Sequence, residues 1–122
     1  MSLQTHKDLN VWQESRKLVS EIHSLTLKFP KDEIYSLSSQ IKRAAVSIPS
    51  NIAEGAARNS NKEYIHFLYI AMGSLAELDT QLTLAKDLNF ITEKELIEVS
   101  ENLNAIGKML SGLIKYRQSK RD

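Results

Sequence analysis

Basic residues flank a run of small side chains in the middle of the sequence and have the chemistry to bind phosphate. They are Lys42, Arg43, Arg58 and Lys62, and a second basic group, Arg117, Lys120 and Arg121, lies near the C-terminal end. Ammonium and guanidinium groups bind the phosphate backbone of nucleic acids without reading base sequence. The alternative for each residue is an ordinary solvated helix position or an ion pair. For Arg43 this alternative is an ion pair with Glu54 or with an acidic residue of the third helix.

Charge is distributed unevenly along the chain, although the formal net charge is only +1. Residues 36–62 carry a net charge of +3, residues 63–101 carry −6, and residues 102–122 carry +4. This pattern predicts a basic surface separate from an acidic one, whichever way the elements pack. A mixed, solvated surface is the alternative.

Residues for metal binding or catalysis do not form a complete set. Glu63 and His66 form half of a di-iron motif, but such sites need a second Glu-x-x-His pair and further carboxylates, and Glu98 and Glu101 come without a histidine. The sequence contains no nucleophile elbow, glycine-rich phosphate loop or zinc signature, and it has no cysteine. We therefore expect no catalytic, cofactor or metal site, and a protein that is not an enzyme.

Aromatic residues are few but of interest, because rings can stack on unpaired bases. The candidates are Trp12, Tyr35, Tyr64, Tyr69 and Tyr116. At helical spacing such residues more often belong to a core or an interface, and that alternative is favoured here.

Apolar residues that recur every three or four positions predict four helices, at about 8–29, 33–58, 61–88 and 93–117. Pro30 is expected to end the first helix, and Ser60–Glu63 and Thr92–Glu95 have the spacing of reciprocal capping boxes. No segment alternates with period two, so the class is all-α. Short connections favour an antiparallel up-down-up-down four-helix bundle in a single domain, residues 1–122.

Chain length and apolar content suit one soluble domain. A chain of 122 residues with 42% apolar residues can bury one core. The first residues lack a signal-peptide core, and no run reaches the length of a membrane span. We expect a cytoplasmic protein without a membrane partner.

The stretch RAAVSIPSNIAEGAAR, residues 43–58, is unusual for a helix because it contains Pro49 and Gly55 among small side chains. The proline is expected to loosen the backbone near the Ala45 carbonyl, with serine hydroxyls, among them that of Ser47, compensating. The lack of side-chain bulk predicts close approach of a neighbouring helix, and Asn51 needs a hydrogen-bond partner wherever it is buried.

Some apolar residues lie beside the main stripes and are expected to remain outside the core, where they would support self-association. They are Ile65, Phe67, Met72, Ile97, Met109, Ile114 and Tyr116.

Several segments together resemble one bacterial family. They are VWQES, FPKDE, SQIKRAAVSIPSNIAEGAAR, EYIHFLYIAMGSLAELDTQL and DLNFI, and they span about residues 9–113. They resemble the 23S rRNA-intervening sequence proteins, with Asp79 standing where glutamate is expected. The resemblance implies a four-helix bundle in a ring-like homo-oligomer, expected to be a pentamer, and no established enzymatic activity. A similar protein, the accessory variability determinant of diversity-generating retroelements, forms such a ring, binds nucleic acid and engages a reverse transcriptase.

Two functions follow as hypotheses. The first is a non-enzymatic oligomer that binds RNA or another nucleic acid through backbone contacts of its basic residues, without base-specific readout. The second is an interaction scaffold or accessory subunit that docks onto a partner enzyme, with no direct role for nucleic acid.

Overall fold

The protein is all-α, as predicted. The computed structural model describes residues 5–33 and 36–120, and within these ranges it contains four α-helices and two short 3-10 turns but no strand. The helices are α1 (Asn10–Thr26), α2 (Leu37–Ala56), α3 (Asn61–Asp87) and α4 (Glu93–Gln118), and the turns are η1 (His6–Asp8) and η2 (Lys31–Glu33).

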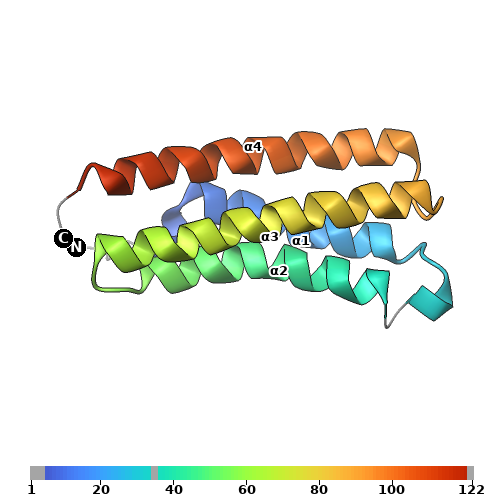
Figure 1. Ribbon diagram of the computed structural model, residues 1–122, viewed down its shortest axis with the longest axis horizontal. Coiled ribbons are helices and arrows are strands. Elements are labelled where there is room, and N and C mark those ends of the chain that lie inside the picture. Colours follow the sequence, from blue (N-terminus) through green and yellow to red (C-terminus); the bar gives the residue numbers. More distant parts are fainter. Residues whose placement is uncertain (1–4, 34–35, 121–122) are drawn as a thin grey trace.

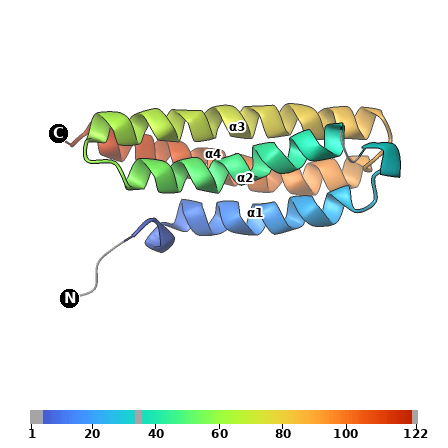
Figure 2. The ribbon, with the colours of Figure 1, turned by 90° about the horizontal axis from the view of Figure 1, so that it is seen from below.

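The four helices lie side by side along one long axis, and the chain reverses direction at each connection (Figures 1 and 2). The turn between α2 and α3 therefore lies at the same end as the start of α1 and the end of α4. The turn between α3 and α4 lies at the opposite end with the connection from α1 to α2 (Figure 1). This arrangement brings segments that are far apart in sequence to a common end.

The first helix is shorter than the predicted range of 8–29. Thr5 caps the separate η1 turn, with its hydroxyl and the Asp8 carboxylate forming a capping box, so α1 begins only at Asn10. At the other end the Thr26 hydroxyl donates to the His23 carbonyl at 2.9 Å, and the Phe29 amide donates to the Thr26 carbonyl in a tighter turn. Local hydrogen bonds end the helix before Pro30 is reached.

The second helix begins at Leu37, not at residue 33, because Lys31–Glu33 form the separate η2 turn. Tyr35 lies outside the described residues. Helices α3 and α4 agree with their predicted ranges to within one residue at each end.

The two predicted capping boxes have different outcomes. Thr92 and Glu95 form the full reciprocal pair, with distances of 2.8 and 3.1 Å, and this prediction is confirmed. At α3 only half of the box is present, because the Glu63 amide donates to the Ser60 hydroxyl at 3.2 Å without a return bond from the carboxylate. The Glu63 side chain is exposed to solvent instead.

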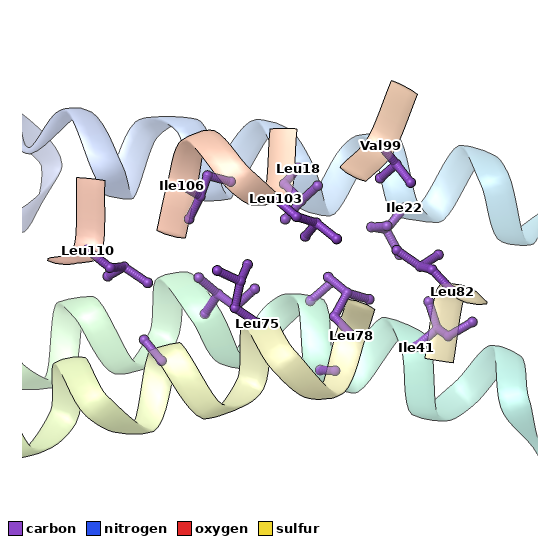
Figure 3. Close-up of a cluster of buried hydrophobic side chains, with 14 of the residues drawn as sticks. Leu18, Ile22, Ile41, Leu75, Leu78, Leu82, Val99, Leu103, Ile106 and Leu110 are labelled. Carbon is purple, nitrogen blue, oxygen red and sulfur yellow. The ribbon is translucent and has the colours of Figure 1, made fainter. Parts of the chain in front are cut away.

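The core lies between all four helices, and Figure 3 shows side chains from each helix converging on it. Fully buried members include Ile22, Ile41, Leu78 and Leu110. Burying a large aliphatic side chain stabilises the folded state by about 1.5–3 kcal/mol, so these rows determine how the helices pack.

The apolar row of α4 shifts by one position near its end. Ile114 was predicted to remain outside the core but is buried, whereas the preceding residue Leu113 is only half-buried. Buried positions in α4 advance by four, three, four and four residues from Val99 onward, which follows the 3.6-residue turn of a straight helix. A strict alternation of three and four does not hold over so many turns.

Helix α2 continues without interruption through Pro49. The Ser47 hydroxyl does not compensate the backbone as predicted, because it bonds to the Ser74 hydroxyl of α3 at 2.7 Å. The Asn51 side-chain amide donates to the Ser47 carbonyl at 2.8 Å and to the Ser47 hydroxyl at 2.9 Å, and neither acceptor is the Ala45 carbonyl that Pro49 leaves without its amide donor. The partly buried Asn51 is thereby satisfied, and the two helices are joined by a short polar contact.

Close approach of a neighbouring helix, predicted from the small residues of α2, is confirmed at Gly55. A β-carbon on Gly55 would lie 3.0 Å from both the Phe67 β-carbon and the Tyr64 carbonyl oxygen. Only glycine leaves room for α3 to lie this close to α2.

Candidate nucleic-acid interface

Positive charge gathers in one half of the bundle. We call residues 5–17, 49–73 and 106–120 the basic half, and the remaining described residues the acidic half. Among the described residues the basic half holds nine basic side chains and four acidic ones, whereas the acidic half holds six and ten. Because each half contains parts of all four helices, the contrast lies along the long axis (Figure 1).

The basic side chains in question are Lys7, Arg16, Lys17, Arg58, Lys62, Lys108, Lys115, Arg117 and Lys120. Of the seven residues predicted to contact phosphate, the structure brings four to this half: Arg58, Lys62, Arg117 and Lys120. Arg121 lies outside the described residues.

Two aromatic rings near the start of α3 contact arginine side chains of the basic half. Tyr64 is buried and Phe67 is half-buried, and both lie against Gly55 of α2. The close approach at Gly55 thus fixes where the rings stand.

Arg58 lies over the Phe67 ring, with its guanidinium carbon 4.7 Å from the ring centroid. It also pairs with Glu54 at 3.3 Å, and both of those side chains are well exposed. The predicted pairing of Glu54 with Arg43 is therefore wrong. Glu54 and Arg58 are four residues apart, and because α2 ends at Ala56 the pair joins the last turn of the helix to the connection that follows it.

Arg117 connects the end of α4 to the start of α3. Its guanidinium carbon lies 4.6 Å from the Tyr64 ring centroid, and the Lys120 ammonium lies 4.5 Å from the Tyr116 centroid. Burial raises the pKa of the Tyr64 phenol, and the positive charge of Arg117 partly opposes that rise. A ring attracts a cation without neutralising it, so these charges remain available to an anion.

Lys42 and Arg43 lie elsewhere, although the sequence suggested that they act with Arg58. They line a shallow groove with Val46 on the acidic half of α2. Thirteen residues of helix separate Arg43 from the end of α2 at Ala56, which corresponds to about 20 Å, and Arg58 lies just beyond that end. The predicted basic cluster of residues 42–62 is thus divided between two places.

Other basic residues of this half were not singled out from the sequence. Lys115 lies one turn before Ser119 on α4, and Lys7, Arg16 and Lys17 surround Trp12 at the start of α1. The antiparallel order of the helices was the signal that would have found them, because it places the start of the first helix beside the end of the fourth.

The described residues contain no group of three or more histidine, cysteine, aspartate or glutamate side chains that could hold a metal ion. His66 is exposed and meets the Phe67 ring edge-on at 5.4 Å. No helix within the described part of the chain is long and apolar enough to cross a membrane.

Comparison with known proteins identifies the family. The model of the 23S rRNA-intervening sequence protein family matches residues 7–112. The chain belongs to this family. Four chains of solved structures also match it, whereas no curated protein does.

One of these structures is a protein of unknown function from the S23 ribosomal protein family of Bacteroides thetaiotaomicron. It is 26% identical to this 23S rRNA-intervening sequence protein, covers 86% of this chain and 98% of its own, and superimposes with a TM-score of 0.80. The family match ends before Arg117 and Lys120, so these two cations of the basic half lie beyond the matched segment.

Proposed function

We propose that this 23S rRNA-intervening sequence protein is not an enzyme and binds RNA or another nucleic acid through phosphate contacts of its basic half. The observation that carries the proposal is the way its cations are held. Arg117 and Lys120 lie on aromatic rings, which position them and leave their charge available, and Arg58 lies on the Phe67 ring beside its exposed partner Glu54.

Binding of this kind draws its free energy from the release of counterions and depends strongly on salt. Phosphate contacts fix a nucleic acid on the surface but do not read its sequence. We therefore expect affinity for many sequences, with no preference that follows individual base pairs.

We further propose that the up-down-up-down bundle is the unit of a ring-like homo-oligomer, with five copies as the expected number. Large apolar side chains remain exposed on the single chain in support of this, namely Leu27, Val46, Tyr69, Ile70, Leu84, Leu88, Ile97, Met109 and Tyr116. A ring would place several basic halves side by side, so weak contacts from each copy would add to a useful affinity. Sedimentation equilibrium at micromolar concentration measures the copy number directly.

A second candidate is a scaffold that docks onto a partner protein. Leu27, Leu88 and Ile97 favour it, because these exposed apolar residues lie on the acidic half, away from the cations described above. On this hypothesis the exposed apolar residues of the acidic half would bind a partner protein. Any binding of nucleic acid would then be incidental.

Salt-dependent binding of RNA by paired charge-removal variants tests the first proposal. Replacing Lys62 and Lys120 with glutamine removes two charges from the basic half, and the matched control replaces Lys31 and Lys94, which lie on the acidic half. The basic-half variant should reduce the slope of log affinity against log salt by about 1.4–1.8, since each phosphate contact contributes about 0.7–0.9.

The control pair should leave the slope nearly unchanged. Equal slopes for the two double variants would overturn the assignment to the basic half. If the unmodified protein fails to bind RNA even at about 50 mM salt, the scaffold hypothesis replaces it.

A further inference from the structure

Trp12 lies in the basic half, beside Lys7, Arg16 and Lys17, and takes no part in the ring contacts of Arg58, Arg117 and Lys120. It is the only tryptophan of the chain and stands near the start of α1, half-buried at the edge of the core. The His6 ring meets it edge-on at 5.1 Å, and the Arg16 guanidinium carbon lies 5.7 Å from its ring centroid.

Two hollows adjoin this ring, and they differ in chemistry. One, of about 670 Å³, is lined by Trp12 together with the polar and basic side chains of Lys7, Gln13, Arg16, Lys17 and Ser20. Lys17 also contacts Glu14 at 3.4 Å, but that pair is largely exposed and therefore weak.

The second hollow, of about 450 Å³, lies between α1 and α2. Its apolar lining combines Trp12 and Val19 of α1 with Val46, Pro49 and Ala53 of α2. Arg16 and Ser20 belong to both hollows, so the apolar space and the cationic space are continuous beside one ring.

We propose that this Trp12 groove binds an unpaired base of a single-stranded nucleic acid. The base would stack on Trp12 against the apolar wall formed by Val19 and Pro49, and its phosphates would contact Lys7 and Arg16. A flat apolar surface beside cations is the arrangement that binds single strands, because every base has a face that can stack. Base pairing hides those faces in a duplex.

This inference rests on the proposed nucleic-acid function and adds a strand preference to it. Phosphate contacts alone do not require unpaired bases, whereas a stacking site does. The groove thus predicts tighter binding of single strands than of a duplex of equal length.

The single tryptophan makes the test direct, because all tryptophan emission of the full-length protein comes from position 12. A ten-nucleotide oligouridine labelled for anisotropy is titrated into the unmodified protein, and the same titration is followed by tryptophan emission. We expect emission to fall with the same midpoint as the anisotropy change. A duplex of equal length should bind without this quenching.

Variants at position 12 give the second measurement. Trp12→Leu should weaken binding of the single strand about 5- to 100-fold, which is the usual effect of losing one stacked base, and should leave duplex affinity unchanged. Trp12→Phe keeps a ring and should recover most of the loss, which separates stacking from any general effect on folding.

The outcomes separate this inference from the function on which it rests. If oligouridine binds and the Lys62/Lys120 variant weakens it, but emission does not change and the duplex binds equally well, the groove assignment is wrong and the basic half remains the interface. If no oligonucleotide binds, millimolar adenosine monophosphate is tested. Quenching by the mononucleotide would support the Trp12 groove as a base-binding site while rejecting the proposed nucleic-acid function. If neither ligand quenches the emission, the assignment of the groove is wrong.

Discussion

Different interactions hold the helices together at the two ends of the bundle. We call the end within the acidic half the acidic end and the end within the basic half the basic end. At the acidic end, Lys28 pairs with the Glu95 carboxylate, which also accepts the Thr92 amide, and the Phe29 and Phe90 rings pack at 5.3 Å. At the basic end, Arg58 and Arg117 lie on the rings of Phe67 and Tyr64. Both arrangements join distant segments of the chain.

The difference lies in what happens to the charge. A cation paired with a carboxylate is neutralised, whereas a cation on a ring keeps its full charge and most of its hydrogen-bond donors. At the acidic end the charge of Lys28 is therefore used in an ion pair that stabilises the fold. At the basic end Arg117 lies on a ring and keeps its charge, Arg58 combines its ring contact with an exposed ion pair to Glu54, and the excess of basic side chains in that half still gives a positive field.

Removing a ring from each end should give the largest effects and separate the two roles. Phe29→Ala removes a buried ring at the acidic end and should lower the free energy of unfolding by about 3–5 kcal/mol, with RNA affinity unchanged among folded molecules. Phe67→Ala removes a half-buried ring and should cost less stability, but it should weaken RNA binding because Arg58 loses its support. Urea unfolding and RNA titration measure the two quantities.

That comparison fails if both substitutions change RNA affinity equally. It would then be the stability of the bundle, and not the position of Arg58, that controls binding.

Substitution of Gly55 should perturb the contact between α2 and α3 at the basic end, where Gly55 lies against Tyr64 and Phe67. Gly55→Ala places a β-carbon 3.0 Å from the Tyr64 carbonyl oxygen, and this backbone has to give by a few tenths of an ångström, so we expect a loss of about 1–3 kcal/mol. Gly112→Ala is the matched control, since no atom lies within 4 Å of the added carbon, and it should stabilise the helix by up to about 1 kcal/mol. Thermal unfolding distinguishes the opposite signs.

Arg117 offers a smaller and more specific test. Arg117→Lys keeps the charge but loses the flat guanidinium that lies on Tyr64, and it should cost about 0.5–1 kcal/mol in stability. RNA affinity should stay within two-fold of the unmodified protein. Arg117→Gln should lower both stability and affinity, and an unchanged affinity for Arg117→Gln would exclude this residue from the interface.

The ion pair at the acidic end should have the smallest effect, and one that depends on pH. The hydrogen bond from Lys28, followed by that from the Thr92 amide, lowers the pKa of the Glu95 carboxyl. A lowered pKa in the folded state stabilises the fold above the unfolded pKa and loses that contribution as pH falls through the folded value.

Glu95→Gln removes this dependence. Between neutral pH and about pH 3 the unmodified protein should lose up to about 1 kcal/mol more stability than the variant, which is the usual ceiling for an exposed pair. Identical pH profiles would show that Lys28 and Glu95 do not interact in solution.

The helices were largely predictable because their apolar spacing is regular, as in α3, where Leu68, Leu78 and Leu82 share one face and are all buried. Errors occurred where local capping overrides periodicity, as at Thr5 and Thr26. Hydroxyl caps act over two or three residues and leave no trace in the apolar pattern.

The candidate site was only partly predictable. The pairing of Glu54 with Arg58 follows from their spacing of four residues across the end of α2, but the contact of Arg117 with Tyr64 joins residues 53 positions apart. That contact depends on how far α4 slides along α3, which the core fixes and the sequence pattern does not specify. The separation of Lys42 and Arg43 from Arg58 has a simpler cause, because the length of α2 alone places them toward opposite ends of the bundle.

Photo-crosslinking from two positions on α4 tests most directly whether nucleic acid binds at the basic end. Tyr116 and Ile97 are matched, since they lie on the same helix with exposed fractions of 53% and 55%, one in each half. With a photoreactive phenylalanine at one position or the other, RNA should crosslink strongly from position 116 and weakly from position 97. Stronger crosslinking from position 97 would contradict the assignment of the interface to the basic half.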